Sequence, residues 1–204
     1  MAKKRKKDTI STGEIRKRIV RGADIARNKF RQMTSREFAL DESSEGFVQA
    51  IVCLEIAGKR RAPWLTLETS VKDILAESSA DPRGPHPRKS KKGRIDAVVW
   101  WKNNKPRAAI EFKNGFVTRE LEADAKRLDQ VLRRVSNLSV VFLVVTTSAA
   151  SQDTLESKRQ QLPEIAGDGW RLASMTKIRS TRGLDSPWFD ATFVLEKKRA
   201  RAAA

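Results

Sequence analysis

The chain has 204 residues, the size of one domain with extensions, and its 42 Lys and Arg against 25 Asp and Glu give a formal net charge of +17. This charge favours a polyanionic partner such as DNA, because Lys and Arg contacts to phosphates release counterions; a basic solubilising surface and an anionic membrane are the alternatives. One cysteine, one histidine and no tyrosine exclude an internal disulfide, a Cys/His zinc site and a catalytic tyrosine, and the sequence has no apolar run of about eighteen residues that would span a membrane.

The N-terminal segment carries over half of the net charge. Residues 1–31 contain twelve Lys and Arg and three acids, a net of +9. The start, MAKKRKKD, has no apolar segment behind its charges, so it is not a secretory signal and we expect a reduced, cytoplasmic setting. Ser11 or Thr12 can cap a basic helix whose apolar residues are Ile15, Ile19, Val20 and Ile25. We interpret residues 1–40 as a basic arm that contacts nucleic acid, with a solvated tail as the alternative.

Residues 41–196 hold the predicted core elements. Ser43–Gly58 has apolar residues at helical spacing, serines before them and a glycine after them, and predicts the first core helix. Pro63–Glu68 predicts a short strand, and the residues after it predict one or two helical turns. Residues 81–92, DPRGPHPRKSKK, predict a loop because three prolines and a glycine break any regular element. Five basic residues make this loop a candidate DNA contact: Arg83, Arg88, Lys89, Lys91 and Lys92.

Residues 94–113 predict a β-hairpin. Two apolar, β-prone segments flank a turn in which Asn103 and Asn104 tolerate a positive φ. Antiparallel partners then have numbers that sum to 207, so Asp96 faces Glu111. Alternation places these two acids on one face with Val98, Trp100, Ala109 and Lys113, and it places on the other face Ile95, Ala97, Val99, Trp101, Ala108, Ile110 and Phe112. We expect this wholly apolar face to be the core face, covered by helices from Ser43–Gly58 and Thr118–Ser136.

The second half of the chain predicts a helix, a central strand and a further α/β region. Thr118 can cap a helix whose apolar stripe is Leu121, Ala125, Leu128, Leu132 and Val135. Leu138–Thr146 is an unbroken apolar run, typical of a strand that is covered on both faces. A helix near Ser151–Gln161, strands near Trp170–Ile178 and Trp188–Leu195, and a surface turn at Arg179–Arg182 follow. Residues 197–204 are interpreted as a basic, alanine-rich tail.

The facing acids of the hairpin indicate a metal site. Two carboxylates directly across a ladder have Cβ atoms about 4.5–5.5 Å apart and repel each other unless a positive charge lies between them. A divalent cation supplies that charge. The alternative is a solvent-exposed face on which Lys113 screens an acidic pair.

Asp96 on one strand and Glu111-Phe112-Lys113 on the next resemble the signature of the PD-(D/E)XK nuclease superfamily. Ile95 stands where the proline of that name would be, a position at which many members differ. The resemblance implies a restriction-endonuclease-like αβββαβ core with a mixed central sheet flanked by helices, the order predicted above. It also implies a helix glutamate at the site, for which Glu45 is the best match and Glu55 the rival. Asp124–Leu128 resembles the helices after E-x-K in some members, where polar residues line the cleft; a solvated face with pairs such as Glu122–Lys126 is the alternative.

The resemblance implies that Asp96 and Glu111 bind Mg²⁺, with the Phe112 carbonyl as a further oxygen ligand, and Mn²⁺ is expected to substitute. Lys113 would orient water or neutralise developing charge, and its carboxylate neighbours should keep it protonated. The expected function is a metal-dependent DNA nuclease, with endonuclease action favoured. The alternatives are a non-catalytic nucleic-acid-binding protein with a nuclease-like fold and a basic structural protein with surface acids. Dimerisation is left open, although cutting both DNA strands requires two sites, which a homodimer supplies.

Overall fold

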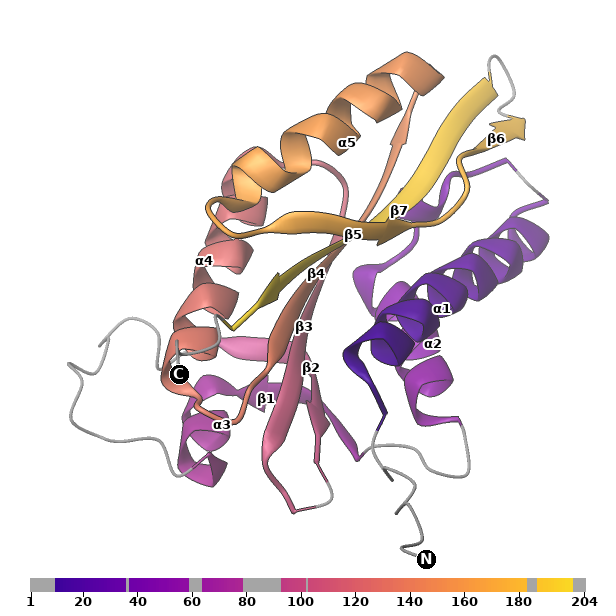
Figure 1. The fold of residues 1–204 in the computed structure, drawn as a ribbon. Helices are drawn as coiled ribbons and strands as arrows, with labels where there is room; N and C mark the ends of the chain where they lie inside the picture. The colour runs from indigo at the N-terminus through magenta and orange to yellow at the C-terminus, as the bar shows by residue number, and fades with distance from the viewer. Residues whose placement is uncertain are drawn as a thin grey trace, which may run out of the picture.

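The computed structural model describes residues 10–35, 37–58, 64–78, 93–101, 103–182 and 187–199, and within them a mixed seven-stranded sheet has helices on both sides (Figure 1). The expected α/β class, with a mixed central sheet flanked by helices, is therefore confirmed. The helices are α1 (Thr12–Met33), α2 (Glu45–Ala57), α3 (Val71–Glu77), α4 (Thr118–Arg134), α5 (Gln152–Ala166) and a 3₁₀ turn, η1 (Leu40–Glu42). The strands are β1 (Leu65–Ser70), β2 (Arg94–Trp100), β3 (Pro106–Asn114), β4 (Val140–Ala149), β5 (Arg171–Met175), β6 (Arg179–Arg182) and β7 (Pro187–Lys198).

The sheet has the strand order β1, β2, β3, β4, β7, β5, and β6 also pairs with β7. Strands β1, β2 and β3 are antiparallel neighbours, whereas β3 and β4 are parallel because α4 carries the chain from the end of β3 back to the start of β4. The hairpin register is the predicted one, with Val98 opposite Ala109, and Asn104 in the turn has a φ of 59°. A register shift between Val99 and Trp100 bends the strand before the turn.

Helices cover both faces of this hairpin, which corrects the expectation of one core face. Figure 1 shows α1 and α2 on one side of the sheet and α4 and α5 on the other. Ile110 and Phe112 pack under α2 as expected, but the second helix on their face is α1 and not the expected α4. Helix α4 lies on the carboxylate face, where it buries Val98 and Ala109 fully. The crossover between parallel strands β3 and β4 must lie on one face of the sheet, and it places α4 over the acids.

Helix α1 is part of the folded core. Ser11 caps it by accepting a hydrogen bond from the backbone N–H of Glu14. Ile15 and Ile19 are fully buried against α2, and Gly22 allows the two helices to approach closely at Val52. On the far side Arg27 is fully buried and its Nε lies 2.9 Å from Asp190 Oδ1 of β7. The helix is therefore fixed to the sheet by apolar contacts and an ion pair, and a nucleic-acid contact of its exposed residues stays a prediction.

The C-terminal region differs from the sequence prediction at its boundaries. Helix α5 continues through Pro163 to Ala166, and Arg179–Arg182, expected to be a surface turn, forms β6. Strand β7 runs through Lys198, so the first two residues of the expected tail belong to the sheet.

Helix α4 begins at Thr118, which was expected to be its cap. The N-cap residue is Val117, which has no capping side chain. In the part of the chain that the structure describes, every helix is too short or too polar to cross a bilayer.

Candidate active site

Asp96 and Glu111 lie where strands β2 and β3 part. The last paired residues of the two strands are Ala97 and Ile110, and the two acids come next in the same register. The backbone N–H of Phe112 donates to Asp96 Oδ2 at 2.7 Å, and Gln49 of α2 donates to the Asp96 carbonyl at 2.8 Å. Strand β3 thus holds the carboxylate of Asp96, and α2 holds its backbone carbonyl.

Glu111 is a buried carboxylate, with 1% of its surface exposed. Arg127 of α4 donates from Nε to Glu111 Oε1 at 2.8 Å. Burial raises the pKa of Glu111 to about 9, against the lowering effect of Arg127 and with a further increase from Asp96. Burial also raises the pKa of Asp96, and the Phe112 N–H opposes this increase.

Lys113 is surrounded by carboxylates from two helices. Its Nζ lies 3.6 Å from Glu45 Oε2, 3.5 Å from Glu120 Oε2 and 3.5 Å from Asp124 Oδ2. Burial lowers the pKa of Lys113, but Asp124, Glu45 and Glu120 together raise it above its usual value. The prediction that carboxylates keep Lys113 protonated agrees with this direction.

The structure brings Glu45, and not Glu55, to this group. Glu45 opens α2, and its Oε2 accepts a hydrogen bond from the backbone N–H of Asn114 at 3.3 Å in addition to its contact with Lys113. Burial raises the pKa of Glu45, and Lys113 opposes the increase. Glu55 lies near the other end of the helix, where it pairs with Arg21 of α1 at 3.2 Å.

Helix α4 contributes residues whose role the sequence left open. Asp124 and Arg127 point into the site, and Arg127 Nη2 donates to Asp124 Oδ1 at 2.7 Å. The Lys126–Glu122 pair, at 3.4 Å, lies on the exposed side of the same helix. The solvated-face interpretation therefore holds for one face of the helix, and a cleft lined by the other face stays a prediction. The sequence signal for this inward face was the spacing of three and four residues that places Asp124, Arg127 and Leu128 on one side of the helix.

Glu68 of β1 is a further acid that the sequence analysis missed. It lies opposite Asp96, because Leu67 pairs with Ala97 and Thr69 with Ile95, and it has a φ of 49° within a strand. Its charge adds to the effects that raise the pKa of Asp96. Only the register of β1, which the hydrophobic pattern of Pro63–Glu68 does not define, reveals this position.

The donors suit a hard divalent cation. Among the described residues there is no group of three or more His, Cys, Asp or Glu side chains placed to hold a metal ion. Proteins bind Mg²⁺ through one or two carboxylates together with water and substrate phosphates, so Asp96 and Glu111 fit this ion without a third acid. Phe112, between Glu111 and Lys113, is 2% exposed, and the role of its carbonyl stays a prediction.

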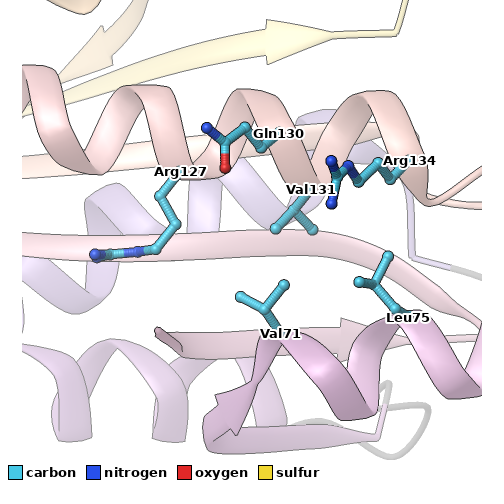
Figure 2. Close-up of a pocket in the computed structure, with 6 residues that line it drawn as sticks. All are labelled: Val71, Leu75, Arg127, Gln130, Val131 and Arg134. Atoms are coloured by element: carbon cyan, nitrogen blue, oxygen red, sulfur yellow. The ribbon is translucent and has the colours of Figure 1, made fainter. Parts of the chain in front are cut away.

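A small pocket between α3 and α4 shares Arg127 with the site. Figure 2 shows Val71 and Leu75 of α3 opposite Val131 of α4, with Arg127 extending away from these three. Gln130 and Arg134 complete the lining. Its apolar part is formed by three aliphatic side chains that pack the two helices together.

The expected DNA contacts of the loop lie outside the described residues: Arg83, Arg88, Lys89, Lys91 and Lys92. Comparison with protein-family models, curated proteins and solved structures gave no match to this chain. Function is therefore argued from the site alone.

Proposed function

We propose that this protein is a metal-dependent nuclease that hydrolyses DNA phosphodiester bonds, and we favour endonuclease action. The observation that carries the proposal is the pair Asp96 and Glu111 at the parting end of a β-ladder, with Lys113 two residues further along β3. The element order α2, β1, β2, β3, α4, β4, with α3 inserted after β1, supports a restriction-endonuclease-like core. The net charge of +17 supports a polyanionic substrate.

Asp96 and Glu111 would hold Mg²⁺, which Mn²⁺ is expected to replace. When bound there, a divalent cation lowers the pKa of water and stabilises negative charge on a phosphate. The protonated ammonium group of Lys113 would orient the attacking water by hydrogen bonding and place a positive charge beside the phosphate. Glu45, Glu120 and Asp124 would hold that ammonium group in position.

A non-catalytic nucleic-acid-binding protein is the second candidate. The observation that favours it is the contact of Arg127 with Glu111, because a carboxylate that already has a positive partner has less need of a metal ion. Asp96, Glu111 and Lys113 are all present, however, and nucleic-acid binding alone requires neither of the two acids. We therefore favour the nuclease.

Incubation with supercoiled and with linear DNA, in Mg²⁺ and in chelator, tests the proposal. An endonuclease nicks or linearises the supercoiled DNA, whereas an exonuclease trims only the linear DNA. We expect Glu111→Ala and Lys113→Ala to lose Mg²⁺-dependent cleavage and to keep DNA binding. Glu122→Ala, which removes an exposed acid from α4, is the control and should cut at the wild-type rate. Cleavage that persists in both site variants would reject the assignment.

A further inference from the structure

Arg127 is a positively charged side chain in contact with Glu111, one of the proposed metal ligands. Its guanidinium contacts Glu111 Oε1 at 2.8 Å through Nε and Asp124 Oδ1 at 2.7 Å through Nη2. The other cation of the site, Lys113, is directed at Glu45, Glu120 and Asp124 instead. Among the described side chains, Arg127 is thus the positive group that contacts Glu111.

This contact and a divalent cation on Glu111 oppose each other. The hydrogen bond takes up one oxygen of Glu111, and a positive charge that close to a doubly charged ion raises the free energy of the bound state. Charge in a partly buried site is poorly screened by salt, so the repulsion persists under ordinary buffer conditions.

The geometry gives Arg127 an alternative partner if it leaves Glu111. Asp124 is three residues earlier on the same helix and already accepts from Nη2, so this pair can persist without Glu111. The side chain of Arg127 lines the pocket between α3 and α4 (Figure 2). It is 31% exposed, so it lies at the surface of the site rather than beneath it.

We propose that Arg127 is a built-in counter-ion of the metal site, which competes with a divalent cation for Glu111 and keeps Asp124 when it is displaced. The inference rests on the proposed function, because it takes Asp96 and Glu111 as the metal ligands. It adds a residue that limits metal affinity rather than one that supports it.

Titration of the full chain with Mn²⁺, followed by calorimetry, tests the inference without any nuclease assay. Arg127→Met should bind Mn²⁺ about ten- to hundredfold more tightly than the wild type, the range expected for loss of a competing charge-assisted hydrogen bond. Arg127→Lys keeps the charge and should stay within a few-fold of the wild type. Arg133→Met is the matched control, since it removes a 79% exposed arginine from the same helix and should leave the affinity unchanged.

Two results would overturn the inference and leave the proposed function standing. Mn²⁺ binding by Arg127→Met that is equal to or weaker than wild-type binding would make Arg127 neutral or supporting. An equal gain in Arg133→Met would make the effect one of net charge alone. Mn²⁺ binding that Asp96→Asn does not remove, in wild type and Arg127→Met alike, would overturn both proposals.

A thermal denaturation cycle in chelator tests the Arg127–Glu111 contact independently. Arg127→Met should lower the Tm, and this decrease should disappear in the Glu111→Gln background, because a neutral glutamine needs no counter-ion. Equal decreases in both backgrounds would show that Arg127 acts through other contacts and would overturn the inference.

Discussion

At the scale of single residues, Glu111 determines the electrostatics of the site. It has almost no contact with solvent, Asp96 on one side and Arg127 on the other. Burial raises its pKa to about 9 even with Arg127 beside it, so ionising this carboxyl group is more costly than ionising an exposed glutamate. A carboxylate that is costly to ionise binds a metal ion more favourably at higher pH, because binding releases the proton.

The first prediction concerns stability in chelator as a function of pH. Because the pKa of Glu111 is raised on folding, the folded state binds more protons, and the free energy of unfolding falls as pH rises from about 5 to about 9. One such group contributes a slope of at most about 1.4 kcal/mol per pH unit. Glu111→Gln should therefore flatten the dependence measured by urea denaturation, although Asp96 and Glu45 retain part of it.

Glu122→Gln provides the control for this series, since Glu122 lies on the exposed side of α4 and contacts Lys126. It should leave the wild-type slope unchanged. An unaltered slope in Glu111→Gln would mean that the buried carboxyl group is already ionised in this pH range.

The sequence predicted the pairing of Asp96 with Glu111 because a hairpin register follows from the turn position and the period of two. It did not predict Arg127 as their partner. On a helix, residues three and four apart share a face, so a charged segment such as Asp124–Arg127 fits an inward or a solvated face equally well until the helix is placed on the sheet. Glu68 was not predicted either, because its position depends on the register of a short edge strand.

At the scale of elements, α1 and α2 form one layer that packs on the sheet face containing Ile110 and Phe112. A Cβ on Gly22 of α1 would lie 2.7 Å from the Cα of Val52 in α2, closer than any relaxed contact. Gly13 of the same helix has no such neighbour, the nearest atom to its Cβ position being Ser11 Oγ at 3.9 Å. The helix contact therefore depends on the absence of a side chain at Gly22.

The second prediction uses these two glycines as a matched pair. Gly22→Ala should lower the free energy of unfolding by about 1–3 kcal/mol, because overpacking outweighs the better helix propensity of alanine. Gly13→Ala should raise it by up to about 1 kcal/mol. Urea denaturation of both variants measures the difference, and stabilisation by Gly22→Ala would show that α1 is not packed against Val52.

The elements themselves were readily predicted, but their sides of the sheet were not. The capped apolar pattern of Ser43–Gly58 became α2, and the stripe from Leu121 to Val135 is buried as expected. A stripe indicates that a helix is covered on one face and does not indicate which sheet face covers it. The parallel pairing of β3 and β4 decides this, and it depends on residues that are distant in sequence.

At the scale of the whole molecule, the net charge of +17 should dominate DNA affinity. Each phosphate that a Lys or Arg neutralises adds about 0.9 to the slope of log affinity against log salt concentration. Five of the basic residues stand together near the N-terminus: Lys3, Lys4, Arg5, Lys6 and Lys7.

The third prediction is a steep salt dependence of binding to a DNA duplex, measured by fluorescence anisotropy. If about six phosphates are neutralised, affinity should fall about a thousandfold between 50 and 200 mM salt. Replacing the five N-terminal basic residues by alanine should reduce the slope if this segment contacts DNA. A flat dependence in the wild type would contradict DNA as the partner.

Cutting of supercoiled DNA by the wild type and by Asp96→Asn, assayed side by side with Mg²⁺, tests the nuclease assignment most directly. We predict nicked and linear products from the wild type in Mg²⁺ and none in chelator. The Asp96→Asn rate should be lower by at least about 10²-fold, the usual effect of removing one electrostatic contributor to catalysis, with DNA affinity within a few-fold of the wild type. Equal cutting by the two proteins would contradict the assignment, and so would the absence of Mg²⁺-dependent cutting by a wild type that binds DNA.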